Sequence, residues 1–263
     1  MPIRALQQHD LKPAVAKRFV HEARIRAGDE ILEIGPGRGR ISDELLAAGA
    51  RVVLVERDPA RAEHLRGHLA EAIAAGRAQV LCGDALVLQP HLAADWRVVA
   101  NPPFQITSQL LRTWLLEDLP AGPPRRIDLV LQKQAAQRLC GTTRYGQSRL
   151  SVLGRLFGSP RLLQHLKRDD VSPPSRVDLA TFSLMRSREQ AASAADLRLV
   201  DRLLEPAFAG PHSVRQALAG LASKAVLSRQ AQLHGWNPDA HPRSVPPRAW
   251  LELARYLRQV GKV

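Results

Sequence analysis

A glycine-rich sequence, EIGPGRG at residues 33–39, is the first of four motifs whose residues could do chemistry. It lies between an apolar run and an amphipathic stretch, so Gly35 and Gly37 are expected in a strand-to-helix turn. Glycine there lets the backbone bend sharply and approach a ligand closely. The spacing is G-x-G-x-G and no Gly-Lys-Ser/Thr follows. Because neither the dinucleotide fingerprint nor the P-loop is present, the turn favours a ligand without a pyrophosphate group.

Acidic residues end or follow the next two apolar runs. Glu56 closes the run VVLVE, where a carboxylate can accept hydrogen bonds from two ribose hydroxyls. Asp84 follows the third run in the sequence CGDA, and its carboxylate could receive the amino group of an adenine ring. Either residue alone could be an ordinary strand-end or turn residue. Together with the glycine turn, they predict a nucleoside-binding crevice at the ends of three strands.

The fourth motif, NPPF at residues 101–104, follows another apolar run. An exocyclic amino nitrogen can take a methyl group from a sulfonium without a metal or a strong base, because a sulfonium is already a good electrophile. The nitrogen lone pair is conjugated with the ring, so acceptors must draw the N–H bonds toward tetrahedral geometry. The Asn101 side-chain oxygen and the Pro102 carbonyl can supply them, and Phe104 can stack on an extruded base. The motif therefore predicts methyl transfer to a base.

Together these motifs resemble those of the rRNA adenine N6-methyltransferases, which include the Erm macrolide-resistance enzymes and the KsgA ribosome-biogenesis dimethylases. The resemblance extends to LQK at residues 131–133, YGQSRL at residues 145–150 and PPSRVD at residues 173–178. It implies S-adenosylmethionine as the cofactor and mono- or dimethylation of adenine N6 in rRNA. It also implies a Rossmann-like methyltransferase sheet with a small all-helical domain.

The resemblance also implies roles for individual residues. The catalytic residues would be Asn101, Pro102 and Phe104. The cofactor-binding residues would be His9, Leu11, Gly35, Gly37, Glu56, Asp84, Ala85 and Asn101. Family members usually have Gln-Asn-Phe-Leu where this chain has QHDL at residues 8–11, so His9 stands in place of an asparagine. No metal-ligand spacing surrounds either cysteine, and no metal is expected.

The choice of rRNA depends on the C-terminal region. The sequence VPPRAW at residues 245–250, and the spacing of FAG at residues 208–210 from Ser213 and Leu218, resemble the Erm enzymes. The main prediction is therefore methylation of an adenine in 23S rRNA, which confers macrolide-type antibiotic resistance. KsgA-type methylation of 16S rRNA is the alternative, and another nucleic-acid amino-methyltransferase stays open. A non-catalytic RNA-binding module on the same fold is the alternative from a different class.

Apolar runs alternate with amphipathic stretches over the first two-thirds of the chain, which predicts a mostly parallel α/β sheet. The expected strands are 30–34, 51–55, 78–82, 97–100 and 127–132. The expected helices are 12–23, 41–48, 59–75 and 107–116, followed by 196–208, 212–234 and 247–260. Strand signals stop near residue 186. We therefore predict a Rossmann-like catalytic domain at 1–185 and a helical RNA-facing domain at 186–263.

Charge is unevenly distributed along the 263 residues, whose formal net charge is +13. Residues 120–168 hold 10 Lys and Arg against one Asp or Glu, which predicts a surface that meets RNA phosphates, although a solvated basic face is the simpler alternative. No run of about 18 apolar residues could span a bilayer, so no membrane contact is expected. The N-terminus lacks a secretory signal, so we expect a cytoplasmic protein, and a monomer suffices for such an enzyme.

Overall fold

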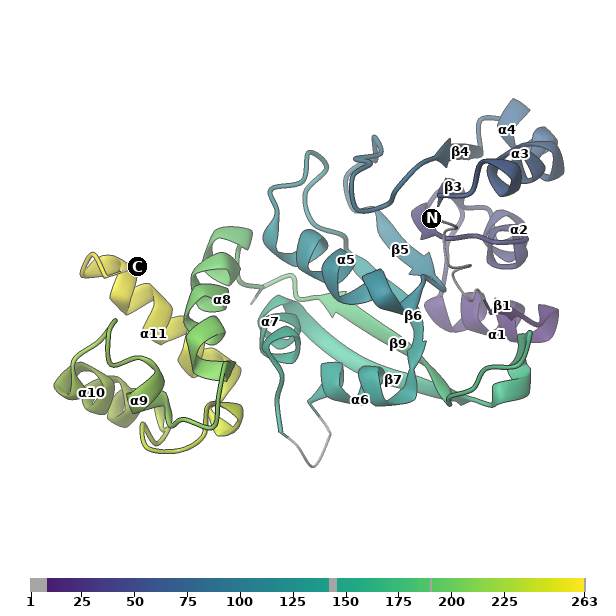
Figure 1. Cartoon of the computed structure of the whole chain (residues 1–263). Coiled ribbons are helices and arrows are strands. Elements are labelled where there is room, and N and C mark those ends of the chain that lie inside the picture. Colours follow the sequence, from purple (N-terminus) through teal and green to yellow (C-terminus); the bar gives the residue numbers. More distant parts are fainter. Residues whose placement is uncertain (1–8, 142–145, 190, 263) are drawn as a thin grey trace, which may run out of the picture. The chain divides into compact units, whose positions relative to one another are not determined.

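The computed structural model, which describes residues 9–141, 146–189 and 191–262, contains a seven-stranded sheet (Figure 1). In spatial order its strands are β4 (Ala78–Cys82), β3 (Arg51–Glu56), β2 (Glu30–Ile34), β5 (Arg97–Ala100), β6 (Arg126–Gln132), β9 (Leu179–Arg186) and β7 (Gly158–Leu166). The first five are parallel, and β9 is antiparallel to β6. The predicted Rossmann-like α/β sheet is confirmed. Gln8 and Tyr145, which belong to family-like motifs, lie outside the described residues.

The order of the strands reverses between β2 and β5. From β2 the chain continues to β3 and β4 on one side, and then returns to place β5 and β6 on the other. In open α/β sheets, ligands bind beyond the carboxyl ends of the strands at such a switch point. All four chemical motifs follow strands β2 to β5, so they lie along this edge.

Four helices cover one face of the sheet: α1 (Pro13–Ala23), α2 (Arg40–Ala47), α3 (Pro59–His68) and α4 (Ala70–Ala74). Alternate strand residues such as Ile31, Leu54 and Val99 are buried with them in one hydrophobic cluster. Helix α5 (Phe104–Leu116) brings Trp114 to Leu32 and Ile34 on the opposite face. The helix expected at 59–75 is interrupted at Leu69, which caps both α3 and α4. Among the described residues, no helix combines the length and apolarity needed to cross a membrane.

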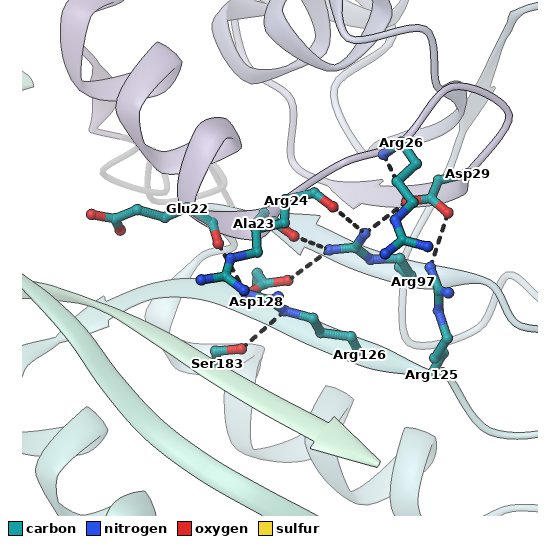
Figure 2. A network of polar contacts seen from close by, with 10 residues as sticks. All are labelled: Glu22, Ala23, Arg24, Arg26, Asp29, Arg97, Arg125, Arg126, Asp128 and Ser183. Carbon is teal, nitrogen blue, oxygen red and sulfur yellow. Dashed lines mark hydrogen bonds and ion pairs between the residues drawn. The ribbon is translucent and has the colours of Figure 1, made fainter. Parts of the chain in front are cut away.

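A buried network of charges joins α1 to the amino ends of β5 and β6 (Figure 2). The Arg97 side chain, 3% exposed, donates to the Ala23 and Arg24 carbonyls and pairs with Asp29 at 2.7 Å and Asp128 at 3.5 Å. Arg126 binds the other Asp128 oxygen through Nε at 3.0 Å and Nη2 at 2.8 Å. These strand ends are opposite to the edge with the motifs. The network therefore holds the end of α1 without touching the candidate site.

The chain divides into two compact units. The first comprises Met1–Trp114, Asp118–Ala136 and Arg161–Met185, and contains the parallel strands. The second comprises Leu115–Glu117, Gln137–Pro160 and Arg186–Val263. Residues 137–160 thus join the second unit although they precede residue 186. Its helices α7 (Arg149–Phe157), α8 (Ala194–Phe208) and α11 (Pro247–Gln259) pack on one another, and Trp250 on α11, which is 1% exposed, lies against Phe208 on α8.

The sequence-based assignments were incomplete before α1 and after β6. The helices expected at 196–208 and 247–260 are confirmed as α8 and α11. The single helix expected at 212–234 is wrong, because Ser213 and Ser223 each cap the start of a separate helix, α9 (Val214–Ala217) and α10 (Lys224–His234). The remaining elements were not predicted: α6 (Lys133–Cys140), α7, β7, β9, two 3₁₀ turns at Arg168–Asp170 and Pro242–Ser244, and a small sheet of β1 (Asp10–Leu11) with β8 (Val171–Ser172).

Candidate active site

The four motifs meet because their strands are neighbours in register. The Gly35 amide donates to the Val55 carbonyl, and the Gly83 amide donates to the Glu56 carbonyl, each at 2.9 Å. On the other side of β2, Leu32 pairs with Val98. Two residues further, the same register places the ends of β2 and β5 side by side. The structure thus brings together the glycine turn, Glu56, the GDA sequence and the NPPF loop, as the sequence predicted.

The glycine turn has a backbone that other residues rarely adopt. Gly35, Gly37 and Gly39 have φ values of 65°, 59° and 80°, in the left-handed region. A Cβ atom on Gly37 would also collide with the carboxylate of Asp10. Asp10 in turn lies 3.5 Å from the guanidinium of Arg38. The turn is therefore closely packed against the N-terminal segment, which the sequence alone did not indicate.

Glu56 has one oxygen without a partner. The side chain is 2% exposed, and its Oε1 accepts from the Asp58 amide at 3.0 Å. Its Oε2 is buried and has no hydrogen-bond partner among the residues that the structure describes. Because a buried carboxylate oxygen without a donor costs free energy, a ligand hydroxyl there would be stabilising. This atom is what a ribose-binding carboxylate requires.

Asp84 and Ala85 occupy the adjacent loop in a different environment. Asp84 Oδ1 accepts from the Leu86 amide at 2.9 Å, and its side chain is 36% exposed. Ala85 lines an apolar pocket together with Ile34, Val55 and Leu88. The loop thus offers a polar oxygen next to an apolar wall, which suits a flat, partly polar ring.

The NPPF loop is fixed at both ends. The Asn101 side chain donates from Nδ2 to the His9 carbonyl at 2.6 Å. Since Nδ2 faces that carbonyl, Oδ1 is the end of the amide left to accept. Pro102 is buried, while Phe104 is partly buried and packs against the hydrophobic cluster. The Thr107 hydroxyl donates to the Pro103 carbonyl at 3.3 Å, which ties the loop to the first turn of α5.

The N-terminal segment passes beside both loops. The His9 ring lies with Nδ1 2.8 Å from the Pro173 carbonyl, and Leu11 is 3% exposed within the hydrophobic cluster. Strand β1 pairs with β8 through Asp10 and Leu11. The cofactor-binding roles of His9 and Leu11 stay predictions. Within the described ranges, no group of three or more His, Cys, Asp and Glu side chains is arranged to hold a metal ion.

Comparison with known proteins identifies the family. The sequence pattern of the family described as ribosomal RNA adenine dimethylase matches residues 6–259. The chain belongs to this family. The protein is therefore an S-adenosylmethionine-dependent rRNA adenine methyltransferase.

Relatives of this methyltransferase are similar along most of their length. The chain is 33% identical over 245 residues to a protein of Jannaschia sp. named ribosomal RNA small subunit methyltransferase A, covering 89% of this chain and 82% of the relative. It is 33% identical over 264 residues to a Synechococcus sp. protein of the same name, covering 95% and 94%. These values extend the family resemblance over both compact units.

Solved structures agree on the fold. The 23S rRNA methyltransferase ErmE superposes with a TM-score of 0.75 and 25% identity, covering 95% of this chain and all of that one. A dimethyladenosine transferase from Plasmodium falciparum gives a TM-score of 0.73 with 21% identity, covering 97% and 99%. The second comparison supports the fold alone.

Glu33 lies next to the candidate site of this methyltransferase, and it was assigned no role from the sequence. It is fully buried in β2, and the Ser42 hydroxyl donates to its Oε2 at 2.6 Å, while Oε1 has no partner among the described residues. Burial raises the pKa of the Glu33 carboxyl to about 8 against the lowering effect of Ser42, and the charges of Asp43 and Glu56 raise it further. Its position as the first residue of the EIGPGRG motif could have identified it from the sequence.

The raised pKa predicts a pH-dependent stability. The folded protein keeps the Glu33 proton up to about pH 8, whereas the unfolded chain releases it near pH 4.5. Stability from this group is therefore full at low pH and falls as the pH rises from about 5 to 8, by about 4 kcal/mol. Urea unfolding at several pH values should show that the free energy of unfolding of Glu33→Gln rises relative to that of wild type over this range. Glu71→Gln, at an exposed position, is the control; a constant difference between Glu33→Gln and wild type contradicts the prediction.

Proposed function

We propose that this enzyme dimethylates adenine N6 in small-subunit rRNA, with S-adenosylmethionine as methyl donor, in the cytoplasm. The observation that carries this proposal is the 33% identity to proteins named for the small-subunit activity, over most of both chains. The main sequence-based prediction, a 23S rRNA target, is kept as the second candidate. It is favoured by the similarity to ErmE, whose whole chain is covered at 25% identity.

The cofactor fits the residues at the carboxyl edge. Glu56 Oε2, buried and without a partner, would accept from the ribose hydroxyls. Asp84 and Ala85 would hold the adenine ring between a carboxylate and the apolar pocket. Gly35 and Gly37 give the turn the left-handed backbone that would let it approach the cofactor closely. When bound, S-adenosylmethionine supplies an electrophilic methyl group.

The NPPF loop would orient the base. Asn101 Oδ1 and the Pro102 carbonyl would accept hydrogen bonds from the two N–H bonds of the adenine amino group, which turns the nitrogen lone pair out of conjugation. Phe104, only partly buried, would stack on a base taken out of the RNA. The nitrogen then forms the new bond to the methyl carbon as the bond from that carbon to sulfur breaks. The extra proton on the methylated nitrogen passes to water, because neither amide oxygen is basic enough to keep it.

The experiment that tests the proposed function is methyl transfer from labelled S-adenosylmethionine to protein-free small-subunit and large-subunit rRNA in parallel. Primer-extension arrest then maps the modified adenine. We expect label in small-subunit rRNA. Label in large-subunit rRNA overturns this choice in favour of the 23S prediction and predicts macrolide resistance in cells.

Glu56→Gln should weaken cofactor binding about 10- to 100-fold, because hydrogen bonds to a charged acceptor contribute about 1.5 to 3 kcal/mol. The glutamine oxygen must accept from the Asp58 amide, so the NH₂ group takes the position of Oε2. An NH₂ group donates and cannot accept from the ribose hydroxyls. Titration calorimetry with S-adenosylmethionine measures the change. The exposed Glu63→Gln, on α3, is the control. Unchanged affinity in Glu56→Gln would remove Glu56 from the cofactor site.

The basic segment at residues 120–168 is only partly available to RNA. Four of its cations are engaged in ion pairs: Arg125 with Asp29, Arg126 with Asp128, Arg149 with Asp201 and Arg168 with Asp178. By contrast, Arg161 and Lys167 are exposed and have no ion-pair partner in the described part of the chain. Arg161 lies on the edge strand β7 and Lys167 directly follows it. We infer that unpaired cations of this kind meet the phosphates.

Two double variants with equal changes in net charge separate these groups. Arg161→Gln with Lys167→Gln should make the fall of log affinity for rRNA with log salt concentration shallower. The magnitude of the slope should decrease by about 1 to 2, because fewer counterions are released. Arg125→Gln with Arg168→Gln should lower it much less, since these cations already face carboxylates. Equal slopes in the two variants would mean that Arg161 and Lys167 only protect the sheet edge.

A further inference from the structure

We propose that His9 is a positioning residue for Asn101. The segment 9–11, called here the N-terminal strap, would be anchored by the His9 ring so that its backbone carbonyl orients the amide of the catalytic loop. The inference rests on the proposed function for the role of Asn101. It assigns His9 a purpose other than the cofactor contact expected from the sequence.

Two hydrogen bonds in series carry the proposal. The His9 ring nitrogen Nδ1 lies 2.8 Å from the Pro173 carbonyl, and the His9 carbonyl accepts from Asn101 Nδ2 at 2.6 Å. Pro173 is 164 residues from His9, and Asn101 is 92 residues from it. A single residue therefore joins the PPSRVD sequence to the NPPF loop.

The rest of the strap is held on its carboxyl side. Asp10 and Leu11 pair with Ser172 and Val171, and the Lys12 amide donates to the Asp170 carbonyl at 3.0 Å. Leu11 is buried in the hydrophobic cluster. The position of the His9 carbonyl is thus set by this short ladder on one side and by the ring on Pro173 on the other.

Chemistry explains why the carbonyl matters. A carbonyl oxygen can only accept, so it selects the NH₂ end of the Asn101 amide and leaves Oδ1 as the free end. If the carbonyl moves away, the amide can rotate by about half a turn and present its NH₂ group to the amino group of the base. Two donors would then face each other, and the acceptor that orients the nitrogen would be lost.

Variants at position 9 test the proposal by single-turnover kinetics with saturating S-adenosylmethionine and total rRNA. His9→Ala should slow methyl transfer about 10- to 100-fold, the usual cost of misplacing a reacting group by about 1 Å. Cofactor and RNA dissociation constants should stay within about threefold of wild type. His9→Asn should restore the rate, because Asn Nδ2 and His Nδ1 are both bonded to Cγ and both can donate. His21→Ala, an exposed histidine on α1, is the control.

Three results would overturn it: an unchanged rate in His9→Ala, a His9→Asn enzyme as slow as His9→Ala, or a loss of cofactor affinity equal to the loss of rate. The last result would return His9 to the cofactor site.

A second measurement needs neither cofactor nor RNA. Asn101 and Asn237 are the two asparagines of the chain, so selective ¹⁵N labelling of asparagine gives two side-chain NH₂ signals. Asn237→Ser assigns them. His9→Ala should shift the Asn101 signal and speed its hydrogen exchange about tenfold or more, while the Asn237 signal stays near wild type. His9→Asn adds a third signal, from the new asparagine, but its Asn101 signal should stay near wild type. An Asn101 signal that ignores His9→Ala overturns the anchor. A failure of the proposed rRNA target leaves this measurement intact.

Discussion

Asn101→Ala is expected to lower the rate of methyl transfer about 10²- to 10³-fold, comparable to the loss of one preorganised group at a reacting centre. The Asn101 Oδ1 atom is held in place by the bond from Nδ2 to the His9 carbonyl. Removing the amide takes away one of two acceptors for the adenine N–H bonds, whereas phosphate contacts elsewhere are unchanged. RNA affinity should therefore stay within about threefold of wild type, as filter binding can measure.

Two further variants make this result specific. Asn101→Asp keeps an acceptor but cannot donate to the His9 carbonyl, so it should be nearly as slow as alanine. Asn237→Ala removes the other asparagine, which is exposed, and should be as fast as wild type. Equal losses of rate and RNA affinity in Asn101→Ala would contradict an orienting role, because they would indicate that the loop had lost its structure.

The candidate site was predictable from sequence because each of its parts is short and contiguous. Gly35 and Asn101 each follow an apolar strand and Glu56 ends one, and in a parallel sheet successive carboxyl ends meet at one edge. Linear order alone therefore predicts which side chains become neighbours. Local sequence also explains the start of α3, where Asp58 caps the helix and its Oδ1 accepts from the Ala60 amide at 2.9 Å.

The contacts that hold the site in place were not predictable in this way. The hydrogen bond between the His9 ring and the Pro173 carbonyl joins residues that are 164 apart in the sequence. It lies next to the sheet of β1 and β8, whose strands of two residues each are too short to give a periodic signal. Arginines were also ambiguous: Arg125 and Arg126 belong to the basic segment, but fold into ion pairs with Asp29 and Asp128. Composition gives the number of cations, whereas only the fold shows which of them already have partners.

The buried network should have the largest effect on stability. Asp128 is fully buried between Arg97 and Arg126, so Asp128→Ala leaves two guanidinium groups without their shared carboxylate. Removing one member of a buried ion pair costs about 3 to 5 kcal/mol. This is a large part of the roughly 5 to 15 kcal/mol that stabilises a typical domain. Urea unfolding of Asp128→Ala should therefore show a much lower midpoint than wild type.

The control is Asp178→Ala, which breaks the exposed pair with Arg168 and should cost about 1 kcal/mol or less. A double variant, Arg126→Met with Asp128→Leu, should lose less free energy of unfolding than Asp128→Ala. It removes the buried charge of Arg126 together with the carboxylate that pairs with it. Similar losses in Asp128→Ala and Asp178→Ala would contradict the buried network. Because Asp128 lies at the strand ends opposite the site, the folded fraction of Asp128→Ala should keep its cofactor affinity, which separates the stability of this sheet from its chemistry.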